Sequence, residues 1–392
     1  MKYKLIQRRD FIKKLGLAVS ALAITPSTFG VKRAESKMLV QRDIEWRNKQ
    51  SEMEYRMLGK TGLMVSAMVI GGGGLSRNNF KFTNAAIERG VNYVDTASRY
   101  AQGRSEEGVG ELLKMAGREK IFVSTKLSSY LPYIDQLSMD YFKALPSIKQ
   151  LEIREEANLM IKNRAVNKSG YYYKFYTEQD EEIPQAYLTH VIRKYAAKNA
   201  TWTKLIKQEL MKTVEGSLVR LGTDYIDILH CPHGARMPEE LEDIAIIETI
   251  ETLKKQGKIR FSGLSIHTDV PGNLEKATEL GHYDMAMVAY NIVNQGSMEL
   301  PIRKAFEKGM GIIAMKGASG VNPPSEKLKP VPQWRIDKLN QAIPEEMKLP
   351  LKAYLWVLQN LHVSGVISAF DNEKMIIENL SLIGRKIDFE KI

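Results

Sequence analysis

Past residue 55, short apolar runs rich in β-branched residues alternate with segments that carry helix signals. Eight runs are candidate strands: 67–70, 92–95, 121–126, 225–230, 260–265, 286–291, 311–316 and 365–369. Clear helix signals lie in 105–115, in 204–221 before Gly222 and in 238–255 before Gly257, since each has an acidic or capping start or a glycine stop. Such alternation is typical of parallel strands joined by helical crossovers. Eight units predict an α/β fold of the (β/α)8 TIM-barrel type.

A doubly wound nucleotide-binding sheet is disfavoured because no GxGxxG opens a helix after a strand. The glycine run 71–74 lacks that spacing and the acidic residue that follows it. We interpret the run either as a flexible loop or as a place where the backbone approaches a bound cofactor, with Gly72 as the candidate contact.

The positive charge of the chain is concentrated at its N-terminus. The formal net charge is +11, but twelve of the Lys and Arg residues lie in the first fifty, against Asp10, Glu35, Asp43 and Glu45. The rest of the chain has no basic run with interleaved aromatic residues, which disfavours a nucleic-acid partner.

The first thirty residues are interpreted as a targeting signal. Residues 7–14 read QRRDFIKK and precede an apolar run, 15–24, and Pro26. This run is too short for a permanent membrane span, which needs about 20 apolar residues. The Arg8-Arg9-x-Phe11-Ile12-Lys13 pattern resembles a twin-arginine signal, so we expect export by that machinery to the periplasm. A basic amphipathic helix is the alternative, and residues 31–54 are expected to be a linker.

Redox chemistry in this chain requires a dissociable cofactor. Cys231 is the single cysteine, which excludes an iron–sulfur cluster held by several of its thiolates. The six histidines show no metal-binding spacing such as HExxH, so we expect no metal site.

Polar residues end three of the predicted strands, where a barrel of this kind forms its active site. They are Asp95, Lys126 and His230, and Tyr100 follows Asp95 by five positions. A lysine and an aspartate at neighbouring strand ends can pair. A cation beside a phenol lowers its pKa from about 10 and suits it to general acid/base work. Taken singly, each residue can be explained by a structural role, such as an ion pair or a histidine buried in the core. Taken together, they predict a catalytic site.

Several stretches carry a family resemblance. They are YRMLGKTGLMVS (55–66), GVNYVDTA (90–97) with Tyr100, SEE (105–107), STK (124–126), LGTDYIDILH (221–230), GKIR (257–260), GLS (263–265), YN (290–291), AMK (314–316) and EN (378–379). In content and order they resemble the aldo-keto reductase superfamily from residue 55 to about residue 383, apart from one insertion. The barrel is therefore expected to span 55–392.

The resemblance implies an NAD(P)(H)-dependent oxidoreductase that interconverts a carbonyl and an alcohol by hydride transfer. Tyr100 would be the general acid, tuned by Asp95 and Lys126, and His230 would orient the carbonyl of a small, sugar-like substrate. The implied cofactor contacts beyond Gly72 are Ser265, Asn291, Met315, Lys316, Lys374, Glu378 and Asn379. Cys231 and His233 match no family role and are interpreted as structural.

Two departures from the family pattern concern the cofactor. Met287 stands where a glutamine commonly holds the carboxamide. Ala369, Phe370 and Met375 stand where basic and hydroxyl residues grip the 2′-phosphate, and Asp371 nearby favours a free ribose hydroxyl. NADP(H) is the family expectation, with NAD(H) as the competitor.

The largest departure is an insertion, about 128–202, after the third strand, where a few residues would suffice. It is expected to cover the active-site mouth as a lid or substrate platform, peripheral to the barrel core. An oligomer contact is the alternative. For the whole chain, the rival function is a catalytically idle, nucleotide-binding regulatory barrel.

Overall fold

The computed structural model describes residues 43–164, 166, 168, 171, 173–196, 200–323 and 326–387. The predicted export signal and residues 31–42 of the predicted linker lie outside these residues. The end of that linker prediction is wrong. Glu45–Trp46 forms strand β1, which pairs with β3 (Leu63–Ser66), and Arg47 is buried over the ring of Phe122. Residues 45–54 therefore belong to the barrel unit, because this buried contact ties them to its wall.

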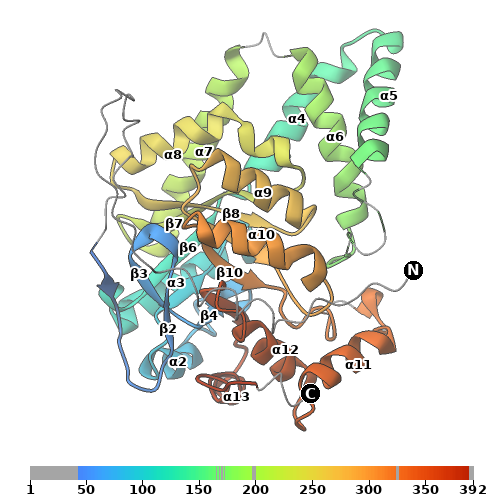
Figure 1. Cartoon of the computed structure of the whole chain (residues 1–392). Helices are drawn as coiled ribbons and strands as arrows, with labels where there is room; N and C mark the ends of the chain where they lie inside the picture. The colour runs from blue at the N-terminus through green and yellow to red at the C-terminus, as the bar shows by residue number, and fades with distance from the viewer. Residues whose placement is uncertain are drawn as a thin grey trace, which may run out of the picture. The chain divides into compact units, whose positions relative to one another are not determined.

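Eight parallel strands close into a barrel, which confirms the predicted fold class (Figure 1). β11 pairs with β4, so the sheet has no free edge. The barrel strands are β4 (Met68–Gly71), β5 (Tyr93–Asp95), β6 (Phe122–Lys126), β7 (Ile226–Ala235), β8 (Ile259–Ile266), β9 (Met285–Ala289), β10 (Gly311–Met315) and β11 (Gly365–Ala369).

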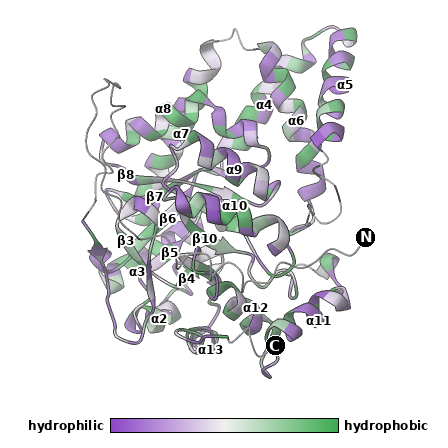
Figure 2. Ribbon diagram, viewed as in Figure 1, coloured by the Kyte–Doolittle hydropathy of each residue, from purple (hydrophilic) through white to green (hydrophobic). Residues whose placement is uncertain are grey.

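Helices surround the barrel, and their apolar sides face it in Figure 2. Two begin at side-chain caps: Asp243 accepts from the Ala245 amide at 3.0 Å, and Asn372 from the Met375 amide at 3.0 Å. The helices outside the insertion are α2 (Asn84–Glu88), α3 (Arg104–Ala116), α7 (Ala200–Leu221), α8 (Ile244–Lys255), α9 (Val270–Leu280), α10 (Gln295–Glu307), α11 (Gln333–Ala342), α12 (Leu349–Leu358) and α13 (Glu373–Leu380). Short 3-10 turns are η1 (Gly59–Thr61), η2 (Gly72–Gly74), η3 (Lys81–Thr83), η4 (Tyr100–Gly103), η5 (Arg118–Lys120), η6 (Pro238–Glu242) and η7 (Glu326–Leu328).

A hairpin fills the amino end of the barrel. It pairs β2 (Tyr55–Met57) with β3, and Leu58, Leu63 and Val65 join one apolar cluster with Tyr93 and Phe122 of the barrel interior. With this end packed, the interior opens toward the carboxyl ends of the strands.

The insertion forms three helices, α4 (Tyr130–Lys143), α5 (Ser147–Arg164) and α6 (Gln179–Ala196), which stand together beyond α7 and α9 (Figure 1). The three helices share an apolar core that includes Phe142 and Tyr187. The side chains of Ile148, Leu151 and Leu159 on α5 are exposed, which is what the oligomer-contact alternative requires.

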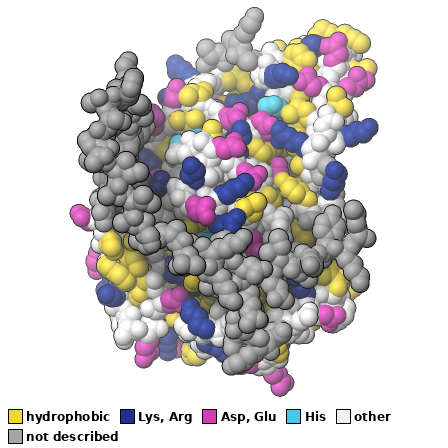
Figure 3. All heavy atoms as spheres, in the orientation of Figure 1, with side chains coloured by type: hydrophobic (Ala, Val, Ile, Leu, Met, Phe, Trp, Pro, Cys, Tyr) yellow, Lys and Arg dark blue, Asp and Glu magenta, His cyan; other side chains and the backbone are white. Residues whose placement is uncertain are grey.

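The described surface shows mixed charge. On the face in Figure 3, Lys and Arg side chains are interspersed with Asp and Glu. Within the described ranges, no helix has the length and apolar character that crossing a membrane demands.

Candidate active site

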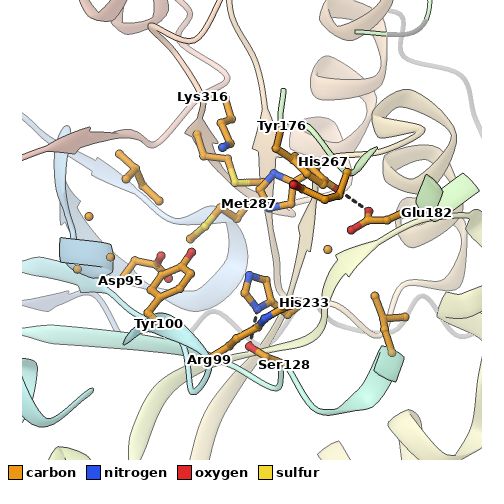
Figure 4. Close-up of a pocket in the computed structure, with 18 of the residues that line it drawn as sticks. Asp95, Arg99, Tyr100, Ser128, Tyr176, Glu182, His233, His267, Met287 and Lys316 are labelled. Carbon is orange, nitrogen blue, oxygen red and sulfur yellow. Dashed lines mark hydrogen bonds between the residues drawn. The ribbon is translucent and has the colours of Figure 1, made fainter. Parts of the chain in front are cut away.

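A cavity of about 1170 Å³ lies at the carboxyl ends of the strands. Its walls come from the strand ends and from the insertion, as predicted for an element that follows the third strand. The cavity wall, part of which Figure 4 shows, includes Gly72, Asp95, Tyr100, Ser128, Asp135, Tyr176, Glu178, Glu181, Glu182, His233, His267, Met287, Met315, Lys316 and Asp371.

Asp95 and Lys126 form a buried ion pair between the ends of β5 and β6. The Lys126 ammonium donates to the Asp95 carboxylate and, at 2.7 Å, to the carbonyl oxygen of Thr96. Ser124 donates to the other carboxylate oxygen at 2.6 Å. Burial alone would lower the pKa of Lys126, but the Asp95 carboxylate and the Tyr100 phenol together outweigh it and raise that pKa. Lys126 is therefore a permanent cation beneath the cavity.

Tyr100 lies against this cation. The Lys126 Nζ atom is 4.9 Å from the centroid of the Tyr100 ring, and the partly exposed phenol lines the cavity. The next two residues, Ala101 and Gln102, have φ of 48° and 59°, a strained region for side chains other than glycine. An ammonium in this position stabilises negative charge that develops on the phenol oxygen.

His230 lies beside the ion pair but does not line the cavity. Its Nε2 is 4.0 Å from the Asp95 carboxylate, its Nδ1 is 3.2 Å from the Leu264 carbonyl oxygen, and its side chain is fully buried. Burial, with the Lys126 charge, lowers its pKa to about 3. A Cβ at Gly263 would come within 2.7 Å of this ring, so only glycine leaves room for the histidine there.

Sequence reasoning missed two histidines that do line the cavity, His233 and His267. His233 ends the β7 extension beyond the predicted strand, and its Nδ1 is 2.6 Å from the Ser128 hydroxyl. His267 follows β8 directly, and burial lowers its pKa to about 3. Both histidines lie at or next to the observed ends of their strands, so a search for polar residues at the observed strand ends, in place of the predicted ones, would have found them.

Three of the predicted cofactor contacts line the cavity: Gly72, Met315 and Lys316. A Cβ at Gly72 would come within 2.7 Å of the Asp95 carbonyl oxygen. Burial alone lowers the pKa of Lys316, and its ammonium makes no ion pair within the described part of the chain. A glycine-lined wall and an unpaired cation in the same cavity suit the phosphates of a dinucleotide.

The other predicted cofactor contacts are not in the cavity wall. Asn291 donates a hydrogen bond to the carbonyl oxygen of Lys316 at 3.1 Å. Asn379 donates one to the carbonyl oxygen of Ala369 at 3.0 Å. Both side chains therefore hold the backbone of loops around the cavity mouth. Ser265 is fully buried behind Met315. Lys374 is exposed, and Glu378 is ion-paired to Lys348 at 2.6 Å.

The insertion supplies a polar wall. Tyr176 packs its ring edge-on against His267, with centroids 5.8 Å apart, and its hydroxyl donates to Glu182. Burial raises the pKa of Glu182. Asp135, Glu178 and Glu181 complete the acidic part of this wall.

The expectation that the insertion is peripheral to the core is wrong. Asp135 of α4 pairs with the buried Arg236, which follows β7. Tyr130 donates to Asp243 at 2.6 Å, and Arg193 does so at 2.8 Å. Buried polar groups of the barrel have their partners in the insertion, so the two parts are structurally coupled.

The sequence model of the Aldo/keto reductase family matches residues 67–321, and the chain belongs to this family. It is similar to the aldo-keto reductase AMT2 of Alternaria alternata, with 25% identity over 55% of this chain and 50% of that protein. It is also similar to L-galactose dehydrogenase of Arabidopsis thaliana, with 22% identity over 85% and 89% of the two chains. The chain thus matches about half the length of AMT2.

Solved structures share the fold. The aldo-keto reductase AKR11C1 from Bacillus halodurans has a TM-score of 0.57 and 20% identity, covering 86% of this chain and 93% of that one. An aldo-keto reductase from Klebsiella pneumoniae in complex with NADPH has a TM-score of 0.54 and 17% identity, covering 86% and 92%.

Proposed function

We propose that the protein is an NAD(P)(H)-dependent oxidoreductase that interconverts a carbonyl and an alcohol. The observation that carries the proposal is the Lys126 ammonium 4.9 Å from the Tyr100 ring, in a cavity that also holds Gly72 and Lys316. A bound nicotinamide would supply the hydride. Family membership supports the same reaction.

In this proposal Tyr100 gives its proton to the carbonyl oxygen as that oxygen becomes an alcohol, and takes it back in the reverse direction. Lys126 stabilises the phenolate that remains. Asp95 holds the ammonium in place, and the packed amino end keeps water from entering below. A regulatory barrel that only binds nucleotide has no need of this cation and phenol. The test is carbonyl-dependent oxidation of NADPH or NADH, followed by absorbance, and no turnover with any carbonyl would favour the idle barrel.

For the cofactor, we propose NADP(H), with NAD(H) as the alternative. The Klebsiella relative holds NADPH, and Lys316 offers a cation to a phosphate. Asp371, which lines the cavity near Gly74, is the residue that would favour NAD(H), because a carboxylate accepts hydrogen bonds from a free ribose hydroxyl. Fluorescence titration with both reduced cofactors decides between them, and Asp371→Asn should shift the preference toward NADPH.

For the substrate, we propose a small carbonyl compound with several hydroxyl groups, such as a sugar. Carboxylates accept hydrogen bonds from hydroxyls, and Glu181 and Glu182 stand in the insertion wall together with Tyr176. Glyceraldehyde and propanal make a matched pair, because they differ only in hydroxyl groups. Glu182→Gln should raise KM for glyceraldehyde and leave propanal unchanged. Equal effects on both aldehydes would contradict a hydroxyl-binding wall.

For location, we propose export by the twin-arginine machinery to the periplasm, supported by the Arg8-Arg9 pattern. Replacing both arginines by lysine should keep the protein in the cytoplasm. Continued export of this variant would show that the pattern was misinterpreted.

A further inference from the structure

Two polar residues at the start of α3, Ser105 and Glu106, have no role in the function proposed above. They lie just past the loop that carries Tyr100, and both side chains are fully buried. A carboxylate is rarely buried to this degree unless it is paired. The partners of Glu106 therefore indicate what it holds in place.

The loop between Tyr100 and α3 has an unusual backbone. Ala101, Gln102 and Gly103 follow one another with φ of 48°, 59° and 90°. Residues other than glycine adopt this left-handed region at a steric cost. Such a conformation persists only where the surrounding structure holds it. Because Tyr100 begins this turn, a change in the turn would move the phenol.

An ion pair between α3 and α7 lies directly against this loop. The Nε and Nη2 atoms of Arg220 are both 2.7 Å from one carboxylate oxygen of Glu106. The Arg220 side chain also packs on Gly103, since a Cβ added there would come within 2.8 Å of its Cδ atom. The guanidinium held by Glu106 thus covers the last residue of the left-handed turn.

The same two residues of α3 tie the loop to the rest of the site. The other carboxylate oxygen of Glu106 accepts a hydrogen bond at 2.5 Å from Thr125, which directly precedes Lys126 on β6. Ser105 donates to the carbonyl oxygen of Gly72 at 2.5 Å. The start of α3 is therefore fixed both to the strand of the catalytic lysine and to the glycine run.

We propose that the buried Glu106–Arg220 pair positions Tyr100, by holding the loop after it in the left-handed conformation that keeps the phenol against the Lys126 ammonium. This inference rests on the proposed function, in which the phenol transfers a proton. Both side chains of the pair lie outside the cavity wall. They are positioning residues, because they act on the reaction only through Tyr100.

The kinetic test is single-turnover reduction of 4-nitrobenzaldehyde by bound NADPH. Arg220→Met should lower the rate at saturating aldehyde about 10- to 100-fold, as expected for a displaced catalytic group. The half-saturating aldehyde concentration and the NADPH affinity should stay at their wild-type values. Arg220→Lys keeps a cation beside Glu106 and should lose less. It carries the test if Arg220→Met does not fold.

Arg118→Met is the matched control. It removes a guanidinium from another fully buried carboxylate, that of Asp227, which lies 2.8 Å away at the amino end of the barrel. This variant should keep the wild-type rate. A wild-type rate in Arg220→Met, or an equal loss in the two variants, would contradict a positioning role for the pair.

A rescue experiment separates positioning from general stability. Glycine adopts the left-handed region without steric cost, and Gln102 is exposed outside the cavity wall. Gln102→Gly, added to Arg220→Met, should therefore recover part of the lost rate. A double variant that is no faster than Arg220→Met alone would overturn the proposal.

A last test needs no turnover. The Tyr100 and Gln102 amides donate to the carbonyl oxygens of Ala97 and Arg99, each at 3.1 Å. These amides should exchange their hydrogens faster in Arg220→Met than in Arg118→Met, because a loosened loop opens more often. Equal exchange in the two variants would show that the pair does not hold the loop. If exchange rises but the wild type reduces no carbonyl, the proposed reaction fails while the hold on the loop stands.

Discussion

The guanidinium of Arg236 makes two hydrogen bonds to the carboxylate of Asp135, at 2.7 and 3.0 Å. Arg236 follows β7 and is almost fully buried, and Asp135 lies on α4 of the insertion. The contact joins the insertion to the barrel and also forms part of the cavity wall.

Asp135→Ala should therefore destabilise the whole protein. Arg236 keeps Glu240 as a partner at 2.8 Å, so the loss is that of one charge-assisted contact, about 1–3 kcal/mol in the free energy of unfolding. Glu152→Ala removes the exposed pair with Lys149 on α5 and should cost less than about 1 kcal/mol. Denaturant unfolding measures both, and equal stabilities would show that the insertion is not coupled to the barrel.

Lys316→Met should weaken cofactor binding tenfold or more, since a hydrogen bond to a charged group contributes about 1.5–3 kcal/mol. Lys316→Arg should retain most of the affinity. Lys374→Ala is the informative control, because the family resemblance implies Lys374 as a contact whereas the structure leaves it exposed outside the cavity wall. Titration by nicotinamide fluorescence gives each dissociation constant. A larger effect at Lys374 than at Lys316 would support the contact that the resemblance implies.

Gly72→Ala should distort the mouth of the barrel, because the added Cβ would lie 2.7 Å from the backbone oxygen of Asp95. Overpacking of this kind costs about 1–3 kcal/mol. At Gly74 the nearest described atom is 3.8 Å away, so Gly74→Ala should keep wild-type stability. Thermal unfolding of the two variants separates them, and identical melting temperatures would argue against a tight fit at Gly72.

Stability should fall as the pH drops below about 6.5, in part because of His230. Its pKa is lowered from 6.5 to about 3 in the folded state, so in that interval the unfolded chain binds the proton and the folded chain does not. Protons therefore favour unfolding, by about 1.4 kcal/mol per pH unit for this group. Urea unfolding at pH 7 and pH 5 should show a smaller difference for His230→Asn than for the wild type. An unchanged difference would mean that His230 is protonated in the folded protein.

The barrel was predictable because several of its strands are continuous apolar runs whose residues are buried on both sides, as in β9. The Asp95, Tyr100, Lys126 and His230 group was predictable from strand ends and family order. His233 was not, because the apolar run ends at His230 while the backbone continues to pair with β8 as far as Ala235. The positions of Lys374 and Glu378 relative to the cavity could not be predicted. They depend on how far the loop before α13 carries that helix from the cavity mouth, and no local sequence pattern specifies this distance.

We propose that Tyr100 supplies the proton for carbonyl reduction. Single-turnover reduction of 4-nitrobenzaldehyde by NADPH bound to Tyr100→Phe measures this step directly, without product release. The rate should fall about 100- to 10,000-fold, the range expected for loss of a general acid, while NADPH affinity stays at the wild-type value. A rate within a fewfold of the wild type would contradict the assignment of Tyr100.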